Sequence, residues 1–245
     1  MYNPLKKLPL HFKGELHDIV LVNFSVAMDE VRDRVPESII AKDFAGRALI
    51  SMVNVKLKRM RLKGLPPGLG FDYQHIGFRL LVKDRQYTPE VEQDRGIYFL
   101  DSFTSRPLMA WGGSLLTDYR LQKAEIFNQQ HSLDLRCGEQ ILSYRVAENE
   151  AAEQHNHELL QTVGAIDRAY STLGSQLRVT QIMREKWPLV PMKALDFRTN
   201  FFRSAHLEGV FRVPEVIYYQ WLPARNLSVK KSRFEGIKMG ILDVT

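Results

Sequence analysis

The feature that most constrains this chain is a succession of short segments rich in β-branched and apolar residues. These segments are connected by turns or short polar stretches rather than by regular amphipathic helices. We expect strands at 17–26, 47–57, 73–82, 96–103, 119–127, 131–137, 140–147, 177–185, 215–221 and 227–234, and short helices at 28–35, 107–116 and 164–173. Strands and helices do not alternate as βαβ units. The sequence therefore predicts an α+β, β-rich fold built on a curved antiparallel or mixed sheet.

Composition limits the architecture further. The chain has 245 residues, with no internal repeat, low-complexity tract or Gly/Ser linker, so we expect a single domain over residues 1–245. The only cysteine, Cys137, excludes an intrachain disulfide and favours a cytoplasmic protein. No segment is apolar for long enough to span a membrane, and no targeting segment is recognisable.

Basic residues are in mild excess, with a formal net charge of +6. They cluster in a basic arm, which we define as Lys56, Lys58, Arg59, Arg61 and Lys63, and in the tail at Lys230, Lys231 and Arg233. An arm of this kind could bind nucleic acid or an acidic partner. No aromatic stacking platform is interleaved with it, so a solvated face or a guarded sheet edge is the favoured interpretation and nucleic-acid binding is the lesser alternative.

Several common chemistries lack their residues in this sequence. There is no phosphate-binding Gly-x-x-x-x-Gly-Lys-Ser/Thr loop, because residues 64–70 contain two prolines and no following Lys-Ser/Thr. There is no Gly-x-Ser-x-Gly nucleophile elbow and no His-Glu-x-x-His helix. His155 and His157 lie two apart beside several glutamates, which is more typical of a polar surface than of a metal site. We expect no cofactor and no metal.

Several segments carry a resemblance to a known family. Residues 18–38, 98–103 and 109–119 resemble the early and central segments of acetoacetate decarboxylase-like proteins. Residues 46–53, 119–126 and 183–189 are similar to the YqjF-like family of uncharacterised conserved proteins within that superfamily. The resemblance implies an acetoacetate decarboxylase-like domain whose sheet closes into a cone- or barrel-like enclosure around a pocket.

The resemblance breaks at the chemistry of the decarboxylase. That enzyme's reactive lysine belongs to a Lys-Lys pair soon after a tyrosine, whereas here Tyr119 is followed by Arg, Leu and Gln before Lys123. The glutamate upstream of that tyrosine has no match in residues 112–114, which are Gly-Gly-Ser. True decarboxylase activity is therefore doubtful.

Strand alternation nevertheless supports a hypothesis for Lys123. It places Tyr119, Leu121, Lys123, Glu125 and Phe127 on one face, which we expect to point inward. Burial would leave more of the Lys123 amine neutral and able to form a Schiff base, with Glu125 moving protons. The alternative is an ordinary Lys123–Glu125 ion pair.

Polar and aromatic residues in apolar surroundings are the other pocket candidates. Arg106, Asp101, His75, Trp111 and Tyr119 could line a ligand site, but each could simply be a satisfied core group. A satisfied or exposed imidazole is the favoured interpretation of His75, and a core position is the favoured interpretation of Trp111. We expect an enclosed pocket for a small carbonyl, carboxylate or apolar ligand. A Schiff-base lyase using Lys123 is the alternative, and the sequence leaves open whether the chain is an enzyme. Exposed sheet edges could also pair two copies into a homodimer.

Overall fold

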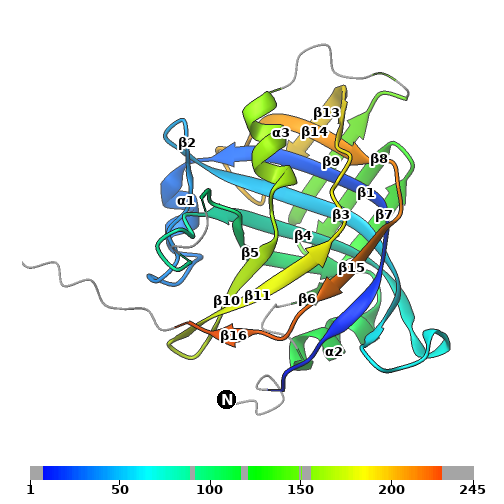
Figure 1. The fold of residues 1–245 in the computed structure, drawn as a ribbon. Helices are drawn as coiled ribbons and strands as arrows, with labels where there is room; N and C mark the ends of the chain where they lie inside the picture. The colour runs from blue at the N-terminus through cyan, green and yellow to red at the C-terminus, as the bar shows by residue number, and fades with distance from the viewer. Residues whose placement is uncertain (1–7, 89–91, 117–120, 149, 151–155, 228–245) are drawn as a thin grey trace, which may run out of the picture.

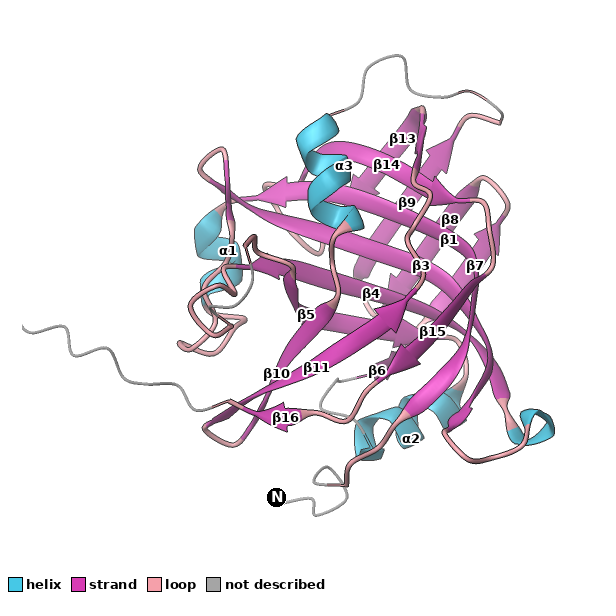
Figure 2. Cartoon of the chain, in the orientation of Figure 1, coloured by secondary structure: helices cyan, strands magenta, loops and turns pink. Residues whose placement is uncertain are grey.

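Strands make up most of the regular secondary structure (Figure 2). The computed structural model describes residues 8–88, 92–116, 121–148, 150 and 156–227 (Figure 1). The strands are β1 (Phe12–Val26), β2 (Asp43–Phe44), β3 (Arg47–Leu62), β4 (Phe71–Val82), β5 (Gly96–Thr104), β6 (Leu121–Lys123), β7 (Glu125–Gln129), β8 (Ser132–Cys137), β9 (Gln140–Val146), β10 (Arg168–Leu173), β11 (Gln176–Arg184), β12 (Val190–Met192), β13 (Ala194–Thr199), β14 (His206–Val213), β15 (Ile217–Trp221) and β16 (Arg225–Asn226). The helices are α1 (Met28–Arg32), α2 (Pro107–Leu116) and α3 (His157–Gly164), with one 3₁₀ turn, η2 (Pro67–Leu69).

The larger of two sheets closes into a barrel. Its closed ring runs β1, β15, β11, β10, β5, β4, β3 and back to β1. The pairing of β10 with β5 is parallel and the other pairings around the ring are antiparallel. The β-rich fold with a curved mixed sheet and few short helices is thus confirmed.

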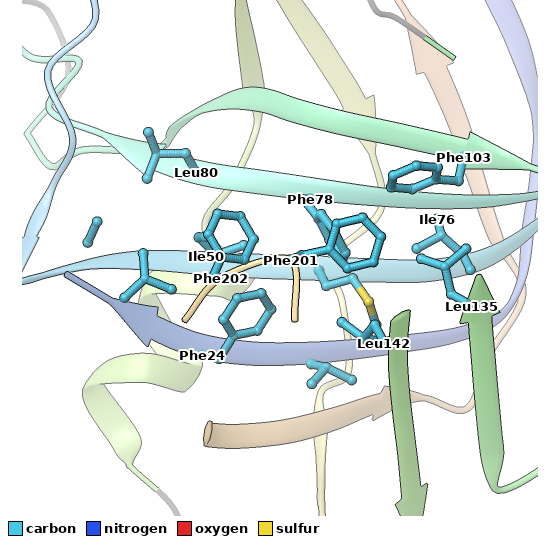
Figure 3. Packing of buried hydrophobic residues seen from close by; sticks show 14 of the residues in the cluster. Phe24, Ile50, Ile76, Phe78, Leu80, Phe103, Leu135, Leu142, Phe201 and Phe202 are labelled. Carbon is cyan, nitrogen blue, oxygen red and sulfur yellow. The ribbon is translucent and has the colours of Figure 1, made fainter. Parts of the chain in front are cut away.

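The second sheet packs against the outside of this barrel. It has four strands in the order β13, β9, β8, β7. Its buried Leu135 and Leu142 face Ile76 and the phenylalanines of the main sheet (Figure 3). Phe78 meets the rings of Phe24, Phe103, Phe201 and Phe202 at centroid distances of 4.9 to 6.3 Å. These contacts make an aromatic core between the two sheets.

A separate core fills part of the barrel interior. In β3 and β4 the two cores take alternate residues, because successive side chains of a strand point to opposite faces. Val53, Val55 and Leu57 point inward, while Met52 and Ile50 belong to the outer core. Helix α3 adds Leu159 and Val163 to the inner core, and Asn156 caps it by accepting a 3.0 Å hydrogen bond from the Leu159 N–H.

The two longer helices lie at opposite ends of the molecule, with α2 beside the start of β1 and α3 at the other end (Figure 1). Helix α3 closes one part of the barrel with apolar side chains. Helix α2 leaves a hollow between itself and the barrel wall, and this hollow is where the candidate site lies.

Most of the elements expected from the sequence are present, with a few exceptions. The helix expected at 164–173 is wrong: α3 ends at Gly164, and Arg168–Leu173 is strand β10. The segment Ala169-Tyr-Ser-Thr172 carries an aromatic and a β-branched residue that favour a strand, and it hydrogen-bonds between β5 and β11. Strands β13 and β14 were not expected from the sequence.

The strand expected at 119–127 is divided between the two sheets. Residues 119 and 120 lie outside the described residues, β6 pairs in parallel with β5, and β7 pairs with β8. The break falls at Ala124, whose N–H donates to the Thr104 carbonyl oxygen at 3.0 Å. Residues beyond 227, with the tail cluster, also lie outside the described residues. None of the helices that the structure describes is long and apolar enough to cross a membrane.

Candidate functional site

A cavity of about 330 Å³ opens into the barrel between α2 and strands β3, β4, β5 and β15. Its wall is mostly aromatic and aliphatic, and it consists of Phe12, Leu57, Met60, Phe71, Tyr73, His75, Phe99, Ser102, Leu108, Met109, Trp111, Gly112, Gly113, Leu121, Tyr219 and Trp221. We call this hollow the aromatic cavity. Its volume falls in the range of ligand pockets, which are also mostly apolar with a few polar groups.

Neighbouring rings form a continuous band along one wall. Tyr73 and Phe99 lie on either side of His75, with ring centroids 6.3 and 6.2 Å away, and the His75 and Phe99 rings are stacked. Phe99 then meets Trp221 at 6.3 Å, and Trp221 meets Tyr219 at 6.4 Å. Strand alternation explains the band, because residues 73 and 75 of β4 share the inward face.

Among the titratable groups that line the aromatic cavity, His75 has the pKa closest to neutral pH. Burial, together with the positive charge of Arg79, lowers the pKa of His75 to about 4. The imidazole is therefore neutral at pH 7 and can both donate and accept a hydrogen bond. No protein hydrogen bond engages it within the described part of the chain. It is thus available to a polar atom of a ligand.

Three hydroxyl groups add to the polar inventory. Burial raises the pKa values of Tyr73 and Tyr219, so both phenols stay protonated. The buried Ser102 hydroxyl has no hydrogen-bond partner among the residues described. The aromatic cavity thus combines apolar walls with a few neutral donors and acceptors.

A smaller space of about 70 Å³ lies deeper in the barrel. It shares Leu57, His75, Phe99, Tyr219 and Trp221 with the aromatic cavity, so the two adjoin. Its remaining walls include Arg79 on β4, Arg184 at the end of β11, and Trp187. The guanidinium carbons of Arg79 and Arg184 lie 5.9 and 4.1 Å from the centroid of the Trp187 ring.

A wider hollow of about 580 Å³ runs along β1, β11 and β15. Polar or charged side chains such as Lys13, Glu15 and Gln220 line it, and Gln181 and Tyr218 there are exposed. A small ligand would remain in contact with solvent on such a surface. The candidate site is therefore the aromatic cavity.

Comparison with protein families identifies the chain. The family model of DUF2071, described as an uncharacterised conserved protein, matches residues 13–221. The chain belongs to the DUF2071 family. The suspected relationship to uncharacterised conserved proteins is confirmed, and a search of curated proteins finds no match.

Solved structures show the same fold in enzymes of distant sequence. An acetoacetate decarboxylase-like enzyme from Sphingomonas wittichii RW1 has a TM-score of 0.60 at 9% identity, covering 91% of this chain and 94% of that chain. The enduracididine biosynthesis enzyme MppR complexed with pyruvate has a TM-score of 0.57 at 15% identity, covering 93% and 92%. The acetoacetate decarboxylase of Legionella pneumophila has a TM-score of 0.53 at 12% identity, covering 90% and 87%. At these identities the likeness establishes the acetoacetate decarboxylase-like fold alone.

Of the residues expected to form the site in this DUF2071 member, two line the aromatic cavity. His75 lies in its wall, and Trp111 projects from α2 at its mouth with 68% of its surface exposed. Arg106 is exposed, and Asp101 pairs with Arg34 and accepts a hydrogen bond from Gln122, so neither lines the cavity. Tyr119 lies outside the described residues.

Lys123 and Glu125 do not have the inward orientation expected of them. Both side chains are exposed, and they lie on either side of the break at Ala124, Lys123 in the main sheet and Glu125 in the second. The expected alternation fails because Ala124 is not part of a continuous strand. No lysine lines the aromatic cavity among the residues described. A catalytic role for either residue stays a prediction.

The basic arm lies in the second half of β3, and only Lys63 follows the strand. Lys56 pairs with Asp18 at 2.7 Å, and Arg59 pairs with the buried Glu15, whose pKa the Arg59 hydrogen bond lowers. These pairs offset part of the arm's charge. In the described chain, no group of three or more His, Cys, Asp or Glu side chains could hold a metal ion.

Sequence reasoning missed Arg79, Arg184, Tyr73 and Tyr219. A signal for Arg79 was present, since alternation along β4 places it on the same face as His75. Arg184 and Tyr219 become neighbours of β4 only when the ring closes through β15 and β11, which no local pattern reveals.

Proposed function

We propose that this DUF2071 protein encloses a small, largely apolar ligand that carries a carbonyl or carboxylate group. The aromatic cavity is the single observation that supports the proposal: about 330 Å³ of space walled by aromatic rings, with the neutral His75 imidazole among them. Such a composition suits a ligand whose body is apolar and whose polar atoms are few.

The solved relatives support the choice of a carbonyl or carboxylate ligand. MppR is described in complex with pyruvate, and also with the condensation product of pyruvate and imidazole carboxaldehyde. This chain shares their fold, and its aromatic cavity, at about 330 Å³, has far more space than the six heavy atoms of pyruvate fill. A larger ligand with an aromatic or alkyl body therefore fits better than pyruvate itself.

Thermal unfolding with a small set of probes tests the proposal. The probes are benzylacetone, hydrocinnamate and pyruvate. A ligand at a hundred times its Kd stabilises the folded state by about 2.7 kcal/mol, which raises the Tm of a chain of this size by roughly 5–10 °C. We expect at least one of the two phenyl compounds to produce such a shift.

Matched variants locate the binding. Trp111→Ala removes an exposed side chain at the mouth of the aromatic cavity and should reduce the Tm shift without unfolding the protein. Leu195→Ala removes an exposed side chain on β13, away from the cavity, and should leave the shift unchanged. Ser102→Leu should abolish it by filling space at the wall. Absence of a shift with both phenyl compounds, or equal shifts in all variants, would refute the proposal.

A further inference from the structure

The deeper space beside the aromatic cavity holds two arginines that lack a carboxylate partner among the described residues. Arg79 is 5% exposed, and Arg184 is half-buried. Neither forms an ion pair with any described residue. The carboxylate that acts most on Arg184, Asp167, is itself paired with Arg95 and Arg168. A buried cation without a counter-ion is costly, so this arrangement needs an explanation.

The hydrogen bonds of these side chains leave donors unused. Arg79 donates from Nε to the Ser51 carbonyl oxygen at 2.9 Å and from Nη2 to Ser51 Oγ at 2.8 Å. Arg184 donates from Nη1 and Nη2 to three backbone carbonyl oxygens. Within the described residues, Arg79 Nη1 and Arg184 Nε have no partner, and the Trp187 Nε1 donor is buried without one.

The pKa values of Arg79 and Arg184 are both lowered, as expected for buried cations without a nearby counter-ion. Burial and the neighbouring Arg184 charge lower the pKa of Arg79 to about 9, and burial lowers that of Arg184 to about 10. Both remain protonated at pH 7, so two positive charges stand close together beside the deeper space. An anion placed there would offset both.

The size of the deeper space limits which anion fits. Its volume of about 70 Å³ is that of roughly two water molecules at ~30 Å³ each. A carboxylate group has three heavy atoms and fits this space. The shared wall of His75, Phe99 and Tyr219 connects this space to the aromatic cavity.

We propose that Arg79, Arg184 and the Trp187 indole N–H form an internal carboxylate subsite. A ligand places its carboxylate there and its apolar body in the aromatic cavity. The ligand class is thus an aryl or alkyl monocarboxylic acid, oriented with its acid group toward the inside of the barrel. This inference rests on the proposed function, because it assigns the inner end of the same ligand.

A matched pair of ligands tests the subsite. Hydrocinnamate and hydrocinnamamide have the same apolar body and differ in the charge of the head group. Isothermal titration calorimetry at pH 7 should show the acid binding about tenfold to a hundredfold more tightly than the amide, since hydrogen bonds to charged groups are the stronger ones. Arg184→Met should bring this ratio close to one, chiefly by weakening the binding of the acid.

A control arginine separates charge at the subsite from charge elsewhere. Arg47 donates from Nε to Ser25 Oγ at 2.8 Å and from Nη2 to the Ser25 carbonyl oxygen at 3.2 Å, which mirrors how Arg79 binds Ser51. It does not line either space, so Arg47→Met should keep the wild-type ratio. Arg79→Lys, which keeps the charge and loses the planar fork, should lower the ratio without abolishing it.

The outcomes distinguish the two proposals. Equal binding of acid and amide to the wild type would refute the carboxylate subsite and leave the aromatic cavity as a ligand site. An acid preference that stays at the wild-type ratio in both Arg184→Met and Arg79→Lys would also refute it. Failure of both compounds to bind would refute the carboxylate subsite, and it would overturn the proposed function as well if benzylacetone also produced no Tm shift.

Discussion

His75 gives the chain a specific dependence of stability on pH. The folded state holds this imidazole with a pKa of about 4, because burial and the Arg79 charge oppose its protonation, whereas an unfolded histidine titrates near 6.5. Below pH 6.5 the unfolded state therefore binds more protons than the folded state. Stability is lost as the pH falls from 6.5 toward 4 and is fully present at pH 8.

The magnitude follows from these two values. Across the whole titration, the difference between 6.5 and about 4 corresponds to about 3 kcal/mol at 1.36 kcal/mol per pH unit. At pH 4.5, where the folded imidazole is partly protonated, the expected loss is about 2.5 kcal/mol. The titratable groups that line the two spaces around His75 include Tyr73, Arg79, Arg184 and Tyr219, and all four keep predominantly the same charge between pH 4.5 and 8.

Urea unfolding at pH 8 and pH 4.5, followed by tryptophan fluorescence, measures this loss. His75→Phe keeps a ring that can stack on Phe99 and cannot titrate. Wild type should lose about 2.5 kcal/mol more than His75→Phe between the two pH values. Groups such as Glu15 and Glu30, whose pKa values are lowered, titrate in both proteins and cancel in this comparison. His206→Gln, at an exposed position, should behave as wild type. Equal losses in wild type and His75→Phe would refute the reasoning.

Three further predictions concern the fold and Lys123. Gly96→Ala should destabilise the fold by about 1–3 kcal/mol, because the added Cβ would lie 2.4 Å from Tyr170 Cε2. Gly112→Ala should not destabilise it, because no atom lies within 4 Å of the added Cβ, and equal urea midpoints for the two variants would contradict this prediction. Leu142→Ala should cost roughly 2–5 kcal/mol in urea unfolding, because Leu142 is fully buried between the two sheets; a loss below 1 kcal/mol, on the order of a surface substitution, would count against this packing. Borohydride reduction in the presence of pyruvate should label Lys123 no more than other exposed lysines such as Lys83, because Lys123 is also exposed. An adduct that is confined to Lys123 and lost in Lys123→Gln would instead support the Schiff-base hypothesis.

The local sequence pattern alone correctly predicted many of the strands and helices. The segments expected at 73–82 and 96–103 are β4 and β5, and the pair at 131–137 and 140–147 forms a hairpin around Gly138, whose φ is +60°. The helix at 107–116 is also present. In these cases the residues' own preferences and the tertiary packing favour the same conformation.

Sequence reasoning placed a strand residue in the wall of the aromatic cavity only where one strand carries the information. His75 was found because it interrupts an apolar strand, and alternation along β4 would have added Arg79. The prediction for Lys123 needed a continuous strand through Ala124, and there the chain passes from one sheet to the other. That transfer depends on hydrogen bonds to β5 and β8, which are remote from the segment's own composition.

The sequence by itself determined the fold class and the inward face of β4, because strand formation and alternation are properties of neighbouring residues. Only the tertiary structure decided what those faces enclose. Closing the ring through β15 and β11 brings Tyr219 and Arg184 to His75 and Arg79, and packing α2 over the opening makes a cavity of the barrel end. Burial then shifts the pKa values of these groups. The shifts depend on the surrounding atoms, so residue type alone does not predict them.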